Sequence, residues 1–300
     1  MQITRGFVTV ATGDEKYYRM AANLCASYRK RGGGKYPFAL ICDRENEYTA
    51  CFDSVIKVDS FSRTTVDKLL MRLSPYRETI FLDADTLILA NIDDLWDIFS
   101  EGDDVSAFGC RLPLESQKGW FTYEGSGKYK PRVNYLISMN GGVYYFRKTD
   151  LAERVFQSAL EVIGEYASID FKYFSTPQDE PLMAMAMVIN GCEPRDVAYP
   201  MIILPAHSRK VTVDYRGNVY ENRKPSGAKM IHFSAARTKL FLYHYLVAAL
   251  EPAGASRKNY RRVKLRDLPA EVKFSLRHTA GALLRKLGLG ELVQRLKKHL

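Results

Sequence analysis

The chain has 300 residues, 46% of them apolar, and can bury one large core, as α/β enzymes of this size often do. Its net charge of +10 suggests a nucleic-acid partner, but residues 251–300 carry 13 Lys/Arg and 4 Asp/Glu, whereas the first 250 carry 31 and 30. The nearly neutral body argues against nucleic-acid binding. We expect a catalytic domain over residues 1–250 and a basic extension over 251–300.

The number and spacing of the cysteines and the length of the apolar runs indicate the cellular compartment of the protein. The five cysteines are an odd number without C-x-x-C spacing, which argues against a disulfide framework and a zinc site. They are typical of buried thiols in a reducing compartment. The chain begins without the apolar stretch of a signal peptide, and no apolar run approaches the length of a membrane span. We therefore expect a cytoplasmic protein.

The first predicted elements are a buried strand over residues 6–12, a turn at Gly13-Asp14 and a helix over 17–30. This order is a natural place for a nucleotide, although similar openings serve many unrelated sites. Short strands are expected at 36–42 and 54–58, and Pro75 should end a helix over 64–73.

Residues 79–82 are typical of a strand buried in a parallel sheet, and Asp83 and Asp85 follow it directly. Side chains at i and i+2 of an extended segment point the same way, so both carboxylates can reach one point beyond the strand. Such oxygens suit hard cations such as Mg²⁺ or Mn²⁺, which commonly bridge carboxylates to nucleotide phosphates. The tripeptide alone is weak evidence, because Asp is also a common turn residue.

A strand over 104–110 precedes a long aromatic-rich stretch, 111–137, without regular pattern. Aromatic faces beside polar groups suit carbohydrate, so its rings could form either a carbohydrate-binding lid or a part of the core. Asn140-Gly141-Gly142 then opens an apolar strand, and adjacent glycines permit either a close ligand approach or a β-bulge. A capped amphipathic helix is expected over 149–166.

Two later motifs could have either a functional or a purely structural role. Asp179 and Glu180 precede an apolar helix over 182–189, where they could serve as an N-cap and a first-turn acid. His232 ends a last strand over 229–234. A lone histidine is more often structural, but neutral imidazole suits Mn²⁺ beside two carboxylates.

The basic extension contains apolar residues at helical spacing between 289 and 300, with Lys and Arg on the other faces. A helix of this kind suits an anionic membrane surface, which would make the protein peripheral on the inner face of a membrane. Packing of the same stripe in a homo-oligomer is the alternative.

Several of these segments, in the same order, resemble glycosyltransferase family 8, which includes glycogenins and lipopolysaccharide galactosyltransferases. The segments are 81–95 with Asp83-Ala84-Asp85, the Asn140-Gly141-Gly142 strand, Asp179-Glu180 and His232. The resemblance implies a GT-A fold, a Rossmann-like and mostly parallel mixed sheet flanked by helices. It also implies a UDP-sugar donor, a divalent metal, and transfer of a hexose with retention to a glycan or glycolipid hydroxyl.

The resemblance assigns the metal, Mn²⁺ or alternatively Mg²⁺, to Asp83, Asp85 and His232. It assigns the donor to residues spread along the chain: Val10, Thr12, Gly13, Tyr17, Lys68, Asp83, Ala84, Asn140, Gly141, Gly142, Arg237 and Lys239. Tyr18 is an alternative to Tyr17, because this chain has one extra residue before the tyrosine.

The resemblance places Asp179 on the donor sugar and Glu180 beneath its anomeric carbon. Glu180 stands where the family has Gln, and a carboxylate can act as a nucleophile or stabilise an oxocarbenium-like centre better than an amide. The chain also departs from the family pattern at Gly13, Gly141, Ala235 and Lys239.

Two other function classes compete with a glycosyltransferase. A nucleotidyltransferase also pairs carboxylates with a metal and a nucleotide, but it releases pyrophosphate. A non-catalytic protein that binds nucleic acid or membrane through its basic charge is the second alternative.

Overall fold

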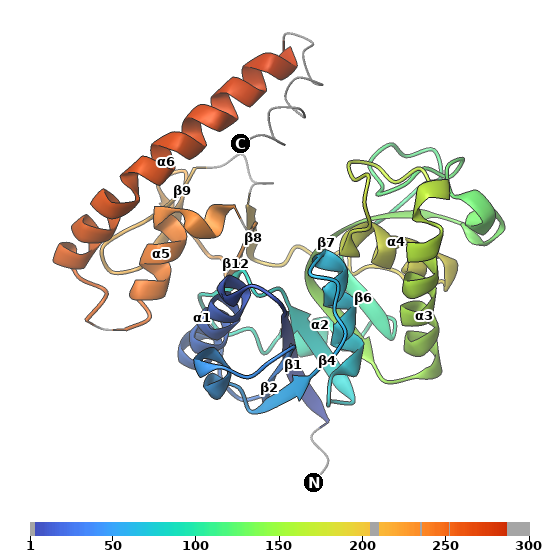
Figure 1. Ribbon diagram of the computed structural model, residues 1–300, viewed down its shortest axis with the longest axis horizontal. Coiled ribbons are helices and arrows are strands. Elements are labelled where there is room, and N and C mark those ends of the chain that lie inside the picture. The colour runs from blue at the N-terminus through green and yellow to red at the C-terminus, as the bar shows by residue number, and fades with distance from the viewer. Residues whose placement is uncertain (1–3, 205–209, 235, 252, 287–300) are drawn as a thin grey trace. The chain divides into compact units, whose positions relative to one another are not determined.

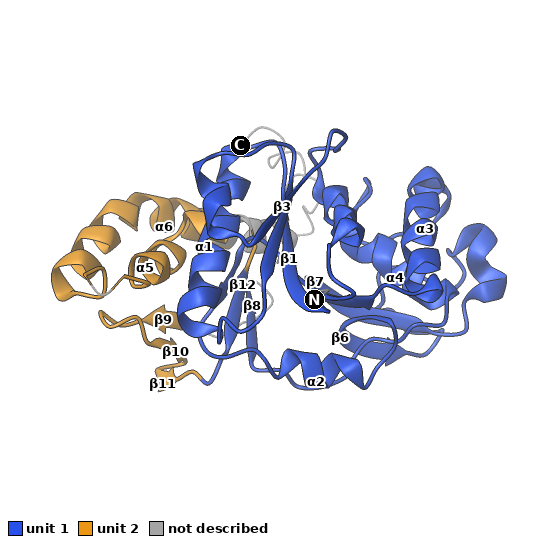
Figure 2. Cartoon of the chain, turned by 90° about the horizontal axis from the view of Figure 1, so that it is seen from below, with its two compact units in different colours: residues 1–203, 227–232 blue, residues 204–226, 233–300 orange. Residues whose placement is uncertain are grey.

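The computed structural model describes residues 4–204, 210–234, 236–251 and 253–286. The chain forms two compact units, Met1–Ile203 with Gly227–His232 and Leu204–Ser226 with Phe233–Leu300 (Figure 2). These boundaries differ from the expected boundary after residue 250, because residues 204–226 and 233–250 group with the C-terminal helices.

A six-stranded sheet forms the centre of the first unit, in the order β3-β2-β1-β4-β7-β6. The first four strands in this order are parallel, and β7 runs antiparallel to both β4 and β6. The strands are β1 Arg5–Ala11, β2 Phe38–Cys42, β3 Ser54–Lys57, β4 Glu78–Leu82, β6 Val105–Leu112 and β7 Leu136–Arg147. The expected fold class, a mostly parallel mixed sheet flanked by helices, is confirmed.

Alternating side chains give the sheet an apolar core on each face, as buried strands should. Phe7, Ile80 and Leu82 point to one core, whereas Val8 and Phe81 point to the other. The first core is covered by α1 and α2, and the second by α3 and α4 (Figure 1). The helices are α1 Glu15–Arg31, α2 Leu95–Ser100, α3 Asp150–Gly164 and α4 Asp179–Ile189.

A small second sheet, in the order β5-β12-β8, lies at the end of β4. Its strands are β5 Thr86–Ile88, β8 Met201–Leu204 and β12 Met230–Phe233. β5 begins immediately after Asp85 and pairs antiparallel with β12, so that His232 lies opposite Thr86. This pairing carries a late segment of the chain to the end of β4.

The second unit contains a three-stranded antiparallel sheet and two helices. Its elements are β9 Val211–Val213, β10 Val219–Glu221, β11 Lys224–Pro225, η5 Arg237–Lys239, α5 Phe241–Ala248 and α6 Arg257–Lys286. α6 packs on α5, with the Tyr245 and Tyr260 ring centroids 4.9 Å apart. The expected apolar stripe over 289–300 lies outside the described residues.

The 3₁₀ segments are η1 Glu47–Cys51, η2 Thr65–Leu73, η3 Gly127–Arg132 and η4 Tyr166–Ser168. The helix expected over 64–73 is therefore 3₁₀, with Thr64 as its N-cap. Asp179 is the first residue of α4, and Gln178 occupies the N-cap position without a side-chain cap. Within the described ranges, no helix is long and apolar enough to cross a membrane.

Candidate functional site

The turn after β4 brings two carboxylates and one imidazole together. The Asp83 N–H donates to the Gly142 carbonyl oxygen over 2.9 Å, and the Thr86 N–H closes the turn on the Asp83 carbonyl over 3.0 Å. His232 Nε2 lies 3.4 Å from Asp83 Oδ2 and 3.2 Å from Asp85 Oδ1. One ligand atom from each of these three side chains lies within 4.8 Å of the others, a spacing that could hold a metal ion.

Asn140 orients the His232 ring. The Gly142 N–H donates to Asn140 Oδ1 over 3.0 Å, so this oxygen is an acceptor. His232 Nδ1 lies 3.1 Å from the same oxygen. With neutral imidazole the proton therefore sits on Nδ1, and the Nε2 lone pair faces the two carboxylates, as in a metal-ligating histidine.

The charge at this turn suits a divalent cation. Asp85 is 7% exposed, and its Oδ1 is buried without a hydrogen bond. Burial and the charge of Asp83 raise the pKa of Asp85 to about 6. Burial alone would lower the pKa of His232, but the two carboxylates outweigh it and raise that pKa to about 10. Protonated His232 and Lys68 supply positive charge to the two carboxylates, and a divalent cation bound between them would take the place of the His232 proton.

Lys68 joins this turn to the start of α4. Its Nζ lies 2.7 Å from Asp83 Oδ2 and 3.1 Å from Asp179 Oδ2. Burial by itself raises the pKa of Asp83, but Lys68 and His232 outweigh burial and hold that pKa below its usual value. Asp179 is 4% exposed, and burial raises its pKa. Asp179 therefore pairs with Lys68 and is not the cap of its helix.

Glu180 is held by the strand opposite. The Gly141 N–H donates to Glu180 Oε1 over 2.6 Å, and Asn140 Nδ2 lies 3.5 Å from the same oxygen. Burial, followed by the charge of Asp179, raises the pKa of Glu180. The two acids at the start of α4 thus face the Asn140-Gly141-Gly142 segment.

A cavity of about 290 Å³ opens beside the turn. Seven of the residues expected to bind donor or metal line it: Val10, Thr12, Tyr17, Lys68, Asp83, Ala84 and Asp85. The alternative Tyr18 is buried and donates its hydroxyl to Asp43 Oδ1 over 2.6 Å, so Tyr17 is the tyrosine at the cavity. Gly13 has a φ of 74° and donates its N–H to the same oxygen over 2.8 Å.

The cavity also contains residues that the sequence did not single out, among them Arg63, Asp67 and Gln178. Asp67 is buried and accepts the Thr12 hydroxyl over 2.7 Å and the Arg63 N–H over 2.9 Å. Its position in the first turn of η2 was visible in the sequence, but its long-range bond to Thr12 was not. Arg63 has a φ of 61°, which is uncommon for a residue with a side chain.

Arg237 and Lys239 lie in η5, which belongs to the second unit. The Arg237 guanidinium lies 5.0 Å from the centre of the Phe274 ring of α6. Burial lowers the pKa of Arg237. Lys239 is exposed.

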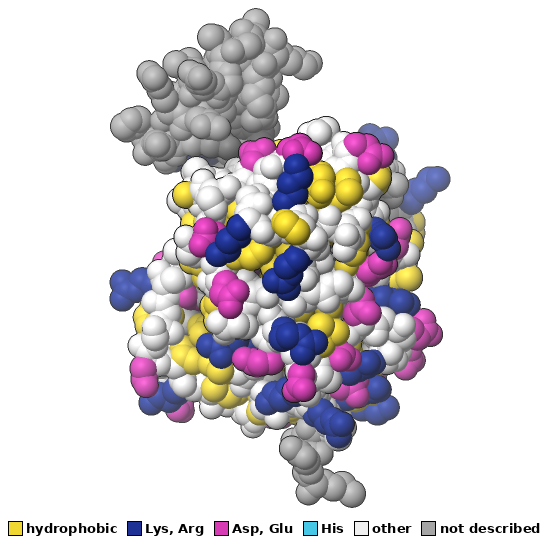
Figure 3. All heavy atoms as spheres, turned by 90° about the vertical axis from the view of Figure 1, so that its right-hand side faces the viewer, with side chains coloured by type: hydrophobic (Ala, Val, Ile, Leu, Met, Phe, Trp, Pro, Cys, Tyr) yellow, Lys and Arg dark blue, Asp and Glu magenta, His cyan; other side chains and the backbone are white. Residues whose placement is uncertain are grey.

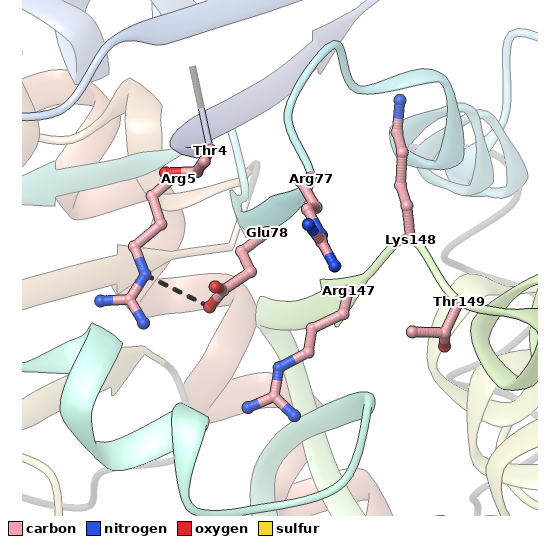
Figure 4. Close-up of a pocket in the computed structure, with 7 residues that line it drawn as sticks. All are labelled: Thr4, Arg5, Arg77, Glu78, Arg147, Lys148 and Thr149. Carbon is pink, nitrogen blue, oxygen red and sulfur yellow. Dashed lines mark hydrogen bonds and ion pairs between the residues drawn. The ribbon is translucent and has the colours of Figure 1, made fainter. Parts of the chain in front are cut away.

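A larger cavity, of about 510 Å³, lies at the opposite end of the central sheet (Figure 4). It is lined by Thr4, Arg5, Arg77, Glu78, Arg147, Lys148 and Thr149, none of them an expected site residue. Its acid, Glu78, is bound by Arg5 over 3.2 Å and by the Tyr145 hydroxyl over 3.0 Å. This cavity therefore has one acidic residue, whereas Asp67, Asp83 and Asp85 line the first.

Comparison with known proteins agrees with the motifs. No family profile matches the chain. The chain is 28% identical to Glycogenin-1 of Caenorhabditis elegans over 165 residues, which are 47% of this chain and 38% of that protein. This match confirms the resemblance to glycosyltransferase family 8.

Two solved structures are also similar. The glycosyltransferase GlyE of Streptococcus pneumoniae TIGR4 has a TM-score of 0.42 and 13% identity, over 65% of this chain and 45% of that one. The bifunctional glycosyltransferase WbbM has a TM-score of 0.46 and 12% identity, over 77% and 46%. The chain spans less than half the length of each of these three proteins.

Proposed function

We propose that the first unit is a metal-dependent retaining glycosyltransferase that moves a hexose from a UDP-sugar to a hydroxyl of a glycan or glycolipid. The observation that carries this proposal is the convergence of Asp83, Asp85 and His232 beside a cavity lined by Thr12, Tyr17 and Lys68 among others. The similarity to a glycogenin supports the same reaction class.

Different groups of residues would bind the metal, the diphosphate and the uridine. Asp83, Asp85 and His232 would hold Mn²⁺, with Mg²⁺ as the alternative, and the bound ion would neutralise charge on the departing UDP. Lys68 lies beside Asp83 and can turn its ammonium to the diphosphate. Val10 of β1, together with Thr12, Gly13, Tyr17 and Ala84, would receive the uridine half. Arg237 and Lys239 are proposed as further phosphate contacts.

The donor sugar would lie between β7 and the start of α4, against Asn140, Gly141, Gly142 and Asp179. Glu180 is then the carboxylate nearest the anomeric carbon. Attack by Glu180 followed by the acceptor would invert the centre twice, and front-face attack by the acceptor hydroxyl would also retain it. Both routes use the same bound geometry.

A UDP-sugar panel with Mn²⁺ tests the proposal. UDP release that needs the metal, with an α-linked product from an α-linked donor in the NMR spectrum, is the expected result. Pyrophosphate release from a nucleoside triphosphate and a sugar phosphate would instead identify a nucleotidyltransferase. A nucleic-acid-binding role gains no support from Figure 3, where basic and acidic side chains are interspersed over the face drawn.

We further propose that α6 contacts an anionic membrane and thereby brings the enzyme to a lipid-linked acceptor. Its exposed apolar residues Leu265, Leu268, Val272 and Leu276 fall on one face at about 100° per residue. Exposed basic residues, including Arg261 and Lys273, occur on the same helix. Such an arrangement suits the headgroup region of a bilayer.

A further inference from the structure

An exposed aromatic group stands beside the proposed sugar site. The Trp120 and Phe174 rings are stacked with their centroids 6.0 Å apart, and the Tyr173 ring lies edge-on to Trp120 at 6.1 Å. Tyr173 is 76% exposed. Rings with one face on protein and one face in water are typical of surfaces that bind partly apolar, partly polar ligands.

The backbone beneath these rings is anchored to the buried core. Phe121 and Phe171 are buried and form an antiparallel bridge, and the Lys172 N–H donates to the Trp120 carbonyl over 2.9 Å. The Trp120 and Tyr173 backbones are therefore set by the core below them. The Tyr173 ring nevertheless points to solvent instead of joining that core.

The Tyr173 backbone is strained as well. Its φ is 73°, in the left-handed region, which is unfavourable for a residue with a side chain. Strain of this kind persists where the surrounding structure imposes it, and it is concentrated at functional sites. Because the Tyr173 ring is exposed, its packing in the core does not offset this strain.

Two connections tie the aromatic group to the proposed donor site. Trp120 Nε1 donates to the Met139 carbonyl over 3.2 Å, and Met139 directly precedes Asn140. Tyr173 and Phe174 begin the segment that leads to Gln178 at the cavity. Thr65 donates its hydroxyl to Gln178 Oε1 over 2.8 Å, which fixes the end of that segment.

We propose that Trp120, Tyr173 and Phe174 form the platform on which a pyranose ring of the acceptor glycan stacks. The proposal rests on the proposed glycosyltransferase function. One face of a pyranose carries C–H groups that can lie on an aromatic ring, while its rim of hydroxyls stays in water. The chemical class is therefore a neutral saccharide, bound through its apolar face.

Saccharide binding without UDP or metal tests the platform directly. The chain has two tryptophans, and Trp96 is buried, so a Trp96→Phe background leaves Trp120 as the fluorescent reporter. Maltotriose, lactose and the methyl glucosides and galactosides are the probes. We expect a fluorescence titration with at least one of them, and none at all would overturn the proposal.

Tyr173→Asn separates binding from folding. Asparagine tolerates a left-handed backbone, so thermal stability should be unchanged or higher, while removal of the ring should weaken saccharide binding about tenfold. Tyr173→Phe keeps the ring and should bind like the parent protein. Lower stability with unchanged binding would mean that the ring is only structural, and this would overturn the proposal.

Kinetics distinguish this proposal from the proposed function. In transfer assays Tyr173→Asn should raise the KM for the saccharide acceptor about tenfold and change kcat much less, since the ring does not contact the reacting atoms. Transfer with an unchanged acceptor KM would overturn the platform and leave the glycosyltransferase intact. Saccharide binding that depends on the Tyr173 ring, without any UDP release, would support the platform and overturn the proposed glycosyltransferase function.

Discussion

At the scale of single residues, two glycines let β7 pass close to the side chains of Asp179, Glu180 and His232. A Cβ on Gly142 would lie 2.5 Å from His232 Nδ1, and a Cβ on Gly141 would lie 2.6 Å from Asp179 Oδ2. Neither glycine has a positive φ, so the requirement is for space and not for an unusual backbone. The close approach of β7 is what allows its N–H groups to hold Asn140 and Glu180.

Gly142→Ala should therefore disturb the proposed metal site. The methyl group must displace the His232 ring or Asn140, and Mn²⁺ affinity should fall about tenfold or more, as when a supporting group of a ligand is lost. Isothermal titration with Mn²⁺ measures this. Gly164→Ala is the matched control, because nothing lies within 4 Å of a Cβ there, and it should leave Mn²⁺ affinity unchanged. Equal affinities in both variants would contradict the assigned ligand set.

Glu180→Ala should lower kcat by about a hundredfold or more while leaving UDP affinity nearly unchanged, because the side chain would act at the sugar carbon and not at the nucleotide. Glu180→Gln should be milder, since Gln is the residue usual in the resembled family. Steady-state kinetics and UDP titration measure the two effects. Near-normal turnover in Glu180→Ala would leave the residue as only a first-turn acid of α4.

At the scale of elements, the second unit depends on the contact between α5 and α6. His244 Nδ1 lies 2.8 Å from Asp267 Oδ2, and the Phe241 N–H donates to Glu271 Oε1 over 3.0 Å. Burial alone would raise the pKa of Asp267, but hydrogen bonds from Arg266 and His244 outweigh it and lower that pKa. A buried, ionised carboxylate thus joins the two helices.

This contact predicts a pH dependence. Because the folded pKa of Asp267 lies below its ordinary value of 3.8, its contribution to stability is complete above that pH and is lost as the pH falls through the folded pKa. Asp267→Asn should cost about 2 kcal/mol of unfolding free energy at pH 7. Urea unfolding should show this difference shrink below pH 3.8. For the exposed Asp97→Asn, no comparable loss is expected at any pH.

At the scale of the whole molecule, the basic charge is concentrated on a helix that is also part of a folded unit. Tyr260, Val263 and Phe274 contact α5 or η5 or are buried, and they fall on the face of α6 opposite the exposed leucines. Deleting the helix from residue 257 would therefore remove packing as well as charge. Substitutions on its exposed face are the cleaner test.

The double variant Leu268→Gln with Leu276→Gln should bind anionic vesicles at least about tenfold more weakly, because each leucine contributes roughly 2 kcal/mol when buried in the interface. Binding of the unaltered protein should also weaken with salt, as the basic groups are screened. Vesicle co-sedimentation measures both. Leu160→Gln, at an exposed leucine of α3, is the control and should bind normally. Unchanged binding, or dissociation of an oligomer instead, would assign the leucine face to a subunit contact.

Local pattern was sufficient for β1, β4 and β7 and for the helices over 15–31 and 150–164, since apolar alternation, helical spacing and N-caps are properties of short segments. The Asp83-Ala84-Asp85 and Asn140-Gly141-Gly142 motifs were equally visible. The sequence therefore predicted the sheet's character, and seven of the residues expected to bind donor or metal line the cavity at the end of β4.

Only the tertiary structure decided how distant segments meet. His232 reaches the carboxylates because β12 pairs with β5 in one particular register, which no local pattern specifies. The bond from Asp67 to Thr12, the choice of Tyr17 over Tyr18, and the 3₁₀ form of η2 likewise depend on packing between elements far apart in the chain. Hydrophobic periodicity determines which face of an element is buried, but the partner against which it is buried is a property of the folded chain as a whole.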